Sequence, residues 1–129
     1  MIYLDTSALV KLVLPEPESA ALFHFLEAHP ERVSSALARA EVIRAVRRAT
    51  RSPRALERAD QVLDRVALVP VDDEVLTGAA LLDPTTLRPL DAIHIATALS
   101  LPLLDAFVTY DAQLVAAAVQ LGCEIVSPQ

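Results

Sequence analysis

The sequence predicts an α/β fold of three layers, with a central, mostly parallel sheet of about five short strands flanked by helices. Short apolar runs alternate with longer stretches in which apolar residues recur every three or four positions, as expected when strands and helices alternate. The strand-like runs are apolar throughout, which is typical of strands covered on both faces. The chain has 129 residues and no repeats or linkers, so we expect a single domain over residues 1–129.

The first half of the chain is predicted to hold two strands and four helices. Helical periodicity marks each helix, and Pro15 and Pro30 end the first two. Pro53 suits the first turn of the fourth helix, where its missing N–H has no partner to lose. The expected elements, in order, are a strand at 2–4, helices at 6–14 and 19–28, a strand at 33–35, and helices at 36–50 and 53–66.

The second half of the chain is predicted to hold three strands and three helices. Its middle helix has almost no polar face and should therefore be buried. Pro70 indicates an edge position for its strand, and Gly122 closes the last helix. The expected elements, in order, are a strand at 68–71, a helix at 74–82, a loop at 83–89, a helix at 91–101, a strand at 106–109, a helix at 111–121 and a strand at 124–126.

Charge is distributed unevenly along the chain. The formal net charge is −6, yet seven of the eleven Lys and Arg residues lie between positions 39 and 58. The net charge argues against broad adhesion to nucleic acid, whereas the arginine-rich segment is either a solvated helical face or a basic surface beside an acidic pocket. No apolar run approaches the roughly 20 residues of a membrane span, and the single cysteine rules out an internal disulfide. We expect a cytoplasmic protein without membrane contact.

Four acidic side chains stand out by their positions. Two follow strands directly, one opens the most buried helix and one borders an apolar helical stripe; they are Asp5, Asp111, Asp91 and Glu41. Each also has a purely structural explanation, because the three aspartates precede helices as N-caps do, and Glu41 can pair with Arg44 or Arg48. If the four converge, their repulsion calls for a divalent cation, and ligands that are all oxygen suit Mg²⁺ or Mn²⁺.

The stretches around these residues resemble the motifs of PIN-domain proteins, in particular those of the VapC-type toxins of bacterial toxin–antitoxin pairs. The similar stretches are Tyr3-Leu-Asp5-Thr-Ser-Ala-Leu, Ala38-Arg-Ala-Glu-Val-Ile-Arg, Leu90-Asp91-Ala-Ile-His-Ile-Ala-Thr-Ala and Phe107-Val-Thr-Tyr-Asp111-Ala-Gln-Leu. The resemblance covers essentially the whole chain, in the order of the family, and no acidic position of the family pattern is missing. It implies a PIN-like version of the three-layer fold.

The resemblance also implies an activity, a site and partners. The family consists of metal-dependent ribonucleases, so the expected ligands of Mg²⁺ or Mn²⁺ are Asp5, Glu41, Asp91 and Asp111. Thr6 and Thr109 are expected to support the site through their hydroxyls. A homodimer and inhibition by a cognate antitoxin are implied as well. The expected reaction is attack of water on an RNA phosphodiester, which leaves a 5′-phosphate and a 3′-hydroxyl.

Basic and imidazole side chains near these motifs have more than one interpretation. Arg44 and Arg48 follow Glu41 by about one and two helical turns and are candidates for contacts with RNA phosphates; a structural or antitoxin-facing role is the alternative. His94 lies one turn after Asp91 and either faces the site or is a hydrogen-bonded core residue.

Two other functions compete with the ribonuclease. A phosphotransferase or phosphoreceiver would use Asp5 as the acceptor, but position 7 is Ser where the phosphatase pattern has a second Asp. The only lysine, Lys11, lies in the first helix instead of after a late strand, where a receiver needs it. The second alternative is a catalytically silent PIN-like module that binds protein or RNA. The complete acidic set argues against that loss, and metal binding by the purified protein distinguishes the two.

Overall fold

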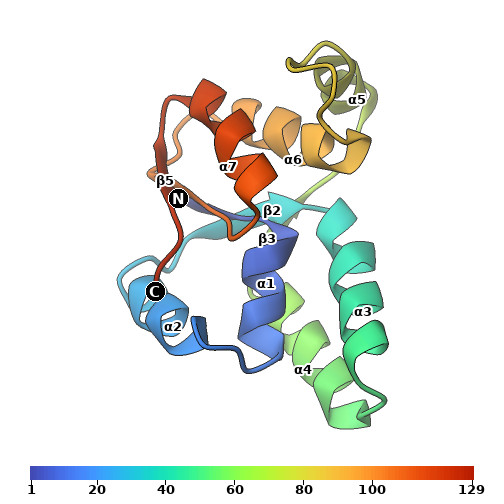
Figure 1. Ribbon diagram of the computed structural model, residues 1–129, viewed down its shortest axis with the longest axis vertical. Coiled ribbons are helices and arrows are strands. Elements are labelled where there is room, and N and C mark those ends of the chain that lie inside the picture. Colours follow the sequence, from blue (N-terminus) through green and yellow to red (C-terminus); the bar gives the residue numbers. More distant parts are fainter.

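The computed structural model describes residues 1–129 and contains one sheet of five strands. The strand order across the sheet is β3-β2-β1-β4-β5 (Figure 1). All neighbouring pairs are parallel, so the expectation of a mostly parallel sheet of about five strands is confirmed. The strands are β1 (Ile2–Leu4), β2 (Arg32–Ser35), β3 (Ala67–Val69), β4 (Ala106–Val108) and β5 (Glu124–Val126).

Seven α-helices cover the two faces of the sheet and complete the three layers that the sequence predicts. Figure 1 shows α1 to α4 on one face and α5 to α7 on the other. The helices are α1 (Thr6–Val13), α2 (Ser19–Glu27), α3 (Leu37–Ala49), α4 (Pro53–Asp64), α5 (Asp73–Ala80), α6 (Pro89–Leu99) and α7 (Ala112–Ala118), which a 3₁₀ turn at Val119–Leu121 extends. All of them are too short or too polar to traverse a bilayer.

The boundaries lie within two residues of the expected ones when the 3₁₀ turn is counted with α7, and two of the differences are informative. Strand β3 ends at Val69, so Pro70 follows the strand instead of lying in it, although β3 is the edge strand that the proline indicates. Helix α6 begins at Pro89, two residues early, because proline suits the first helical position. Asp91 therefore lies in the first turn of α6, and the alternative explanation that it caps this helix is wrong.

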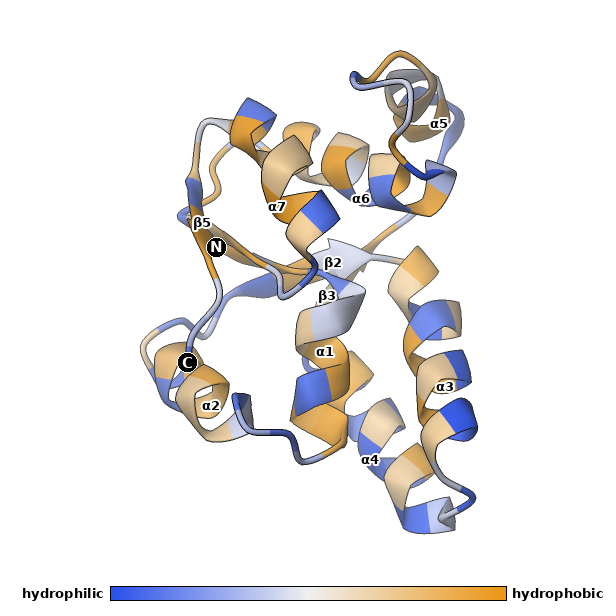
Figure 2. Cartoon of the chain, in the orientation of Figure 1, coloured by the Kyte–Doolittle hydropathy of each residue, from blue (hydrophilic) through white to orange (hydrophobic).

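Two apolar clusters lie on opposite faces of the sheet. Side chains alternate along β1, so Ile2 and Leu4 pack among α1 to α4, while Tyr3 packs with residues of α6 and α7. All three side chains are at most 1% exposed, which explains why β1 is apolar throughout. Figure 2 shows that α3 is amphipathic: its hydrophobic side faces α1 and α4, and its hydrophilic side faces away from them.

The strand order creates a topological switch between β1 and β4. From β1 the chain adds β2 and β3 on one side and then returns to add β4 and β5 on the other. In parallel α/β sheets, ligands bind outside the carboxyl ends of the strands at such a point. Asp5 directly follows β1 and Asp111 lies shortly after β4, so the fold brings both to this edge of the sheet.

Candidate active site

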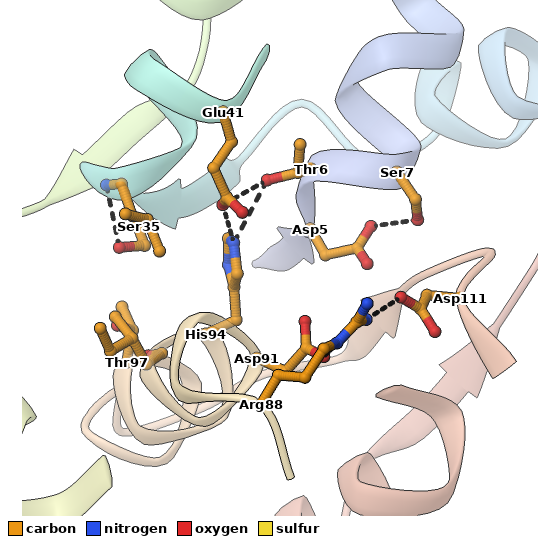
Figure 3. Close-up of polar contacts among 12 residues, drawn as sticks. Asp5, Thr6, Ser7, Ser35, Glu41, Arg88, Asp91, His94, Thr97 and Asp111 are labelled. Carbon is orange, nitrogen blue, oxygen red and sulfur yellow. Dashed lines mark hydrogen bonds and ion pairs between the residues drawn. The ribbon is translucent and has the colours of Figure 1, made fainter. Parts of the chain in front are cut away.

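The four carboxylates that stand out in the sequence line one open cavity of about 700 Å³. They come from the start of α1, the body of α3, the first turn of α6 and the start of α7, and their side chains are Asp5, Glu41, Asp91 and Asp111. Figure 3 shows these side chains facing a common space. The structure therefore brings together residues from both ends of the chain, which sequence periodicity alone could not show.

Asp5 is the most buried of the four, with 2% of the residue exposed. It is the N-cap of α1, because Oδ1 accepts hydrogen bonds from the backbone N–H of Ala8 at 2.9 Å and from the hydroxyl of Ser7 at 2.7 Å. Oδ2 accepts a hydrogen bond from the hydroxyl of Thr109 at 2.6 Å. Burial raises the pKa of Asp5, and these three hydrogen bonds offset burial only in part. The cap and the cavity residue are thus the same side chain.

The hydroxyls of Ser7 and Thr109 also connect the start of α1 to the segment between β4 and α7. Thr109 is fully buried, and its hydroxyl accepts a hydrogen bond from the backbone N–H of Asp111 at 3.1 Å. The Ser7 hydroxyl accepts one from the backbone N–H of Tyr110 at 2.9 Å. Each hydroxyl donates to Asp5 at the same time. The position of Asp5 is therefore coupled to the backbone that carries Asp111.

Glu41 is held by one hydroxyl and one imidazole. Its Oε1 accepts hydrogen bonds from the hydroxyl of Thr6 and from Nε2 of His94, both at 2.7 Å. A carboxylate only accepts, so Nε2 carries the shared proton. Burial is the largest single influence and would raise the pKa of Glu41, but the hydrogen bond and charge of His94, together with the hydrogen bond from Thr6, outweigh it and lower the pKa below its usual value. The alternative pairing of Glu41 with Arg44 or Arg48 is wrong.

His94 is held at both ring nitrogens. Its Nδ1 lies 2.8 Å from the hydroxyl of Tyr3, while Nε2 donates to Glu41. Tyr3 is fully buried, and its ring stacks on that of Phe107 with centroids 4.9 Å apart. His94 is itself 2% exposed and also lines the cavity. It is thus both a hydrogen-bonded core residue and a residue of the site, which the sequence treats as alternatives.

Asp91 and Asp111 are joined by a single guanidinium. Nε of Arg88 donates to Oδ2 of Asp91 at 2.6 Å, and its second terminal nitrogen donates to Oδ2 of Asp111 at 2.7 Å. Figure 3 shows the Arg88 side chain reaching from Asp91 toward Asp111. The hydrogen bond and charge of Asp91, and then those of Asp111, raise the pKa of the guanidinium. The other oxygen of Asp111 caps α7 through the N–H of Gln113 at 2.9 Å.

The carboxylate oxygens in the cavity are the kind of ligand that suits a hard divalent cation, but the four side chains do not converge on one point. All four are carboxylates, the ligands that Mg²⁺ and Mn²⁺ prefer. No three Asp, Glu, His or Cys side chains are close enough together to hold a single ion. Two of the four instead share Arg88. A cation bound to Asp91 and Asp111 would therefore compete with this guanidinium.

The arginines considered for RNA contact lie outside the acidic cavity. Arg44 and Arg48, together with Arg47, line a separate cavity of about 250 Å³ on α3. All three side chains are exposed. Helix α3 thus presents Glu41 to the acidic cavity and its arginines to solvent.

Sequence reasoning did not assign Ser7, Lys11 or Arg88 to the site, although all of them line the cavity. Lys11 pairs with Glu16 and Glu18 and lies 4.7 Å from the ring centroid of Tyr110. The spacing of Arg88 and Asp91, three residues apart, is a pattern that brings opposite charges together at a helix start. Ser7 and Lys11 lie four residues apart on α1, so helical spacing places them on one face.

Comparison with known proteins identifies similar sequences and folds. The family model described as the PIN domain matches residues 2–119. Ribonuclease VapC46 of Mycobacterium tuberculosis is 48% identical over 128 residues, which cover 98% of this chain and 97% of that protein.

Two solved structures have similar folds at low sequence identity. VapC20 of Mycobacterium tuberculosis, a toxin that cleaves the sarcin-ricin loop, superposes with a TM-score of 0.73 at 19% identity, over 91% of this chain and 95% of that chain. A toxin–antitoxin complex from Klebsiella pneumoniae gives a TM-score of 0.74 at 22% identity, over 100% of this chain and 98% of that chain. Both proteins therefore share the three-layer α/β fold of this chain.

Proposed function

Because the chain belongs to the PIN-domain family and to its VapC type, we propose that it is a toxin ribonuclease, acting as a single domain over residues 1–129. In this proposal it hydrolyses RNA phosphodiester bonds with Mg²⁺ or Mn²⁺. The similarity to a ribonuclease at 48% identity over nearly the whole chain supports the reaction. VapC20, which cleaves the sarcin-ricin loop, supports RNA as the class of substrate.

One observation carries the proposal: four carboxylates from separate elements line one cavity at the switch point of the sheet. Helix capping accounts for Asp5 and Asp111. It does not account for Asp91, which lies inside the first turn of α6, or for Glu41, which lies within α3. A charged cluster of this kind is expected where a cation neutralises it.

The proposed roles follow from how each side chain is held. The residues that would hold the cation are Asp5, Glu41, Asp91 and Asp111, and their side chains would have to move closer together than they lie here to share one ion. A divalent cation in this place supplies polarisation of the phosphodiester and makes a neighbouring water more acidic. Thr109 orients Asp5, and Thr6 orients Glu41, through hydrogen bonds of 2.6 and 2.7 Å. Either Asp91 or Asp111, through a carboxylate oxygen that the cation leaves free, would accept the proton of the attacking water.

The proposal includes partners that the cavity itself does not reveal. A cognate antitoxin is supported by the toxin–antitoxin complex from Klebsiella pneumoniae, whose fold is similar over the whole chain. We propose a homodimer in the cytoplasm, where RNA substrates are present, on the resemblance to VapC-type proteins.

The arginines of α3 are proposed to bind RNA phosphates that flank the cleaved bond. Replacing both Arg44 and Arg48 with Ala should weaken RNA binding and flatten its salt dependence, by about 0.7 in slope for each lost phosphate contact. A variant with Arg54→Ala and Arg65→Ala, two other exposed arginines, makes the same charge change elsewhere. Equal RNA binding by the two double variants would contradict this role.

The first test is Mn²⁺ binding, followed by loss of the paramagnetic resonance signal of the free ion. Wild type is compared with Asp5→Asn and Asp91→Asn, and with Asp83→Asn, an exposed aspartate outside the cavity. We expect wild type and Asp83→Asn to bind the ion and the two cavity variants to lose it. Folded wild type that binds no Mn²⁺ would favour the catalytically silent binding module.

The second test is RNA cleavage by the same proteins. Wild type and Asp83→Asn should cleave in the presence of Mg²⁺ or Mn²⁺ and leave 5′-phosphate ends, whereas the two cavity variants should lose activity. Ends that carry a 2′,3′-cyclic phosphate would contradict attack by water.

A further inference from the structure

Arg88 connects two elements of the site through two charged hydrogen bonds. Asp91 belongs to α6 and Asp111 to the start of α7, and the guanidinium donates to both at 2.6 and 2.7 Å. Arg88 is the residue that precedes α6, and its side chain makes no capping bond. The guanidinium therefore has the two carboxylates as its hydrogen-bond partners.

No other arginine or lysine binds any of the four carboxylates. Lys11 also lines the cavity, but it pairs with Glu16 and Glu18 outside the acidic set. The Arg88 side chain is 57% exposed, so it can leave its partners without a rearrangement of the core. Arg88 is thus the one movable cation in contact with the acidic set.

The guanidinium and a divalent cation cannot use the same oxygens together. The guanidinium occupies Oδ2 of Asp91 and of Asp111, so a cation held by these two carboxylates would compete with it, and the two positive charges would repel each other at close range. A guanidinium released at this point would lie beside the phosphodiester that the cavity must receive. Its planar set of N–H donors suits two phosphate oxygens as well as two carboxylate oxygens.

We propose that Arg88 is a resident counter-ion that changes partners: it holds Asp91 and Asp111 while no metal is bound, and contacts an RNA phosphate once a divalent cation takes those carboxylates. This inference rests on the proposed function, because it assumes a metal-binding cavity that receives RNA. According to this inference, Arg88 lowers the affinity of the protein for the metal ion and raises its affinity for the RNA substrate. These two effects have opposite signs for one substitution, which makes the inference testable.

The first experiment compares Mn²⁺ affinity in wild type, Arg88→Gln, Arg88→Lys and Arg51→Gln. Arg51 is exposed and outside the cavity, so its replacement controls for the change in net charge. Arg88→Gln should bind Mn²⁺ about tenfold more tightly than Arg51→Gln, because the competing charge is gone. Arg88→Lys should lie between them, since an ammonium keeps the charge but lacks the planar fork.

The second experiment measures binding of a short, fluorescently labelled single-stranded RNA by anisotropy, with Ca²⁺ in place of the catalytic ion. Arg88→Gln should bind this RNA about fivefold more weakly than Arg51→Gln, the loss expected for one charged contact. Tighter Mn²⁺ binding together with weaker RNA binding supports the exchange of partners.

Each failure has a distinct meaning. Equal Mn²⁺ affinity in all four proteins leaves the metal site intact and overturns the role of Arg88. Equal RNA binding by Arg88→Gln and Arg51→Gln overturns the phosphate contact and with it the exchange. Absence of Mn²⁺ binding in all four proteins, Arg88→Gln included, overturns the metal site of the proposed function and this inference with it.

Discussion

Asp5 and Glu41 are held in a different way from Asp91 and Asp111, although all four line the same cavity. The first two accept hydrogen bonds from side chains that are themselves packed, such as Thr109 and His94, which are at most 2% exposed. The second two are joined by Arg88, whose side chain is 57% exposed. We call these pairs the packed carboxylates and the arginine-bound carboxylates.

The difference separates what the fold determines from what a ligand can change. The packed carboxylates are positioned by contacts that form when the core forms, so their geometry is part of the folded state. The arginine-bound carboxylates depend on two ion pairs with one solvent-exposed arginine, and such pairs contribute little to stability. A ligand can therefore exchange the partner of Asp91 or Asp111 more easily than that of Asp5. Substitutions at the packed pair should change both stability and activity, whereas those at the other pair should mainly change binding.

The largest effect on stability is expected for His94→Ala. The substitution removes a buried ring, leaves the Tyr3 hydroxyl without its partner and takes one hydrogen bond from Glu41. The free energy of unfolding should fall by about 2–4 kcal/mol. RNA cleavage should fall by roughly 10–100-fold, as for other residues that orient a metal ligand. Thermal unfolding and cleavage assays measure the two effects.

His24→Ala is the matched control, because the His24 side chain is 87% exposed. It should leave the unfolding temperature and the cleavage rate unchanged. If His94→Ala also leaves the unfolding temperature and the cleavage rate unchanged, the position of Glu41 does not depend on His94. Glu41 would then not belong with the packed carboxylates.

The sequence predicts the fold well because the fold depends on local patterns. Helical periodicity, and proline at the ends of helices, identify all seven helices, and buried apolar runs identify the five strands. The sequence also places Asp5 and Asp111 shortly after strands, and this local position predicts that both lie at the switch edge of the sheet. Asp91 is placed less well, since the sequence does not show whether α6 begins at the aspartate or two residues earlier at Pro89.

The partners of the site residues depend on contacts between distant segments, which local patterns do not specify. Glu41 has arginines nearby on its own helix, yet it binds His94, 53 residues away. Arg88 lies in the loop expected at 83–89, and no periodicity indicates where a loop side chain points. Its link to Asp111 spans 23 residues and appears only when α6 and α7 are packed.

An intermediate effect is expected for Thr109→Val. The fully buried hydroxyl donates to Asp5 and accepts from the backbone N–H of Asp111, so its loss leaves two groups without a partner. The free energy of unfolding should fall by about 1–2 kcal/mol, measured by urea denaturation without metal. Thr97→Val is the control, because the equally buried Thr97 hydroxyl bonds only to the carbonyl of Ile93 in its own helix. If the free energy of unfolding falls equally in both variants, the hydrogen bond from Thr109 to Asp5 contributes no more to stability than the bond from Thr97 to Ile93.

The smallest effect, and the one of opposite sign, is expected for Asp5→Asn in metal-free protein. Burial raises the pKa of Asp5 in the folded state. The folded protein therefore holds this proton more tightly than the unfolded chain does, and wild-type stability declines as the pH rises through the folded-state pKa. An amide carries no such proton and can still accept the bonds from Ser7 and Ala8. At neutral pH, Asp5→Asn should unfold a few degrees above wild type.

The pH dependence of this difference distinguishes the cause. The gain in unfolding temperature should be present at neutral and alkaline pH and shrink as acidification protonates Asp5 in wild type, since the variant then replaces a neutral group. Asp72→Asn is the control, because Asp72 caps α5 in the same way but is exposed. Its difference from wild type should vary less with pH. If Asp5→Asn destabilises the metal-free protein at every pH, the packed carboxylate is stabilising in its charged form, and hydrogen bonding outweighs burial at the centre of the site.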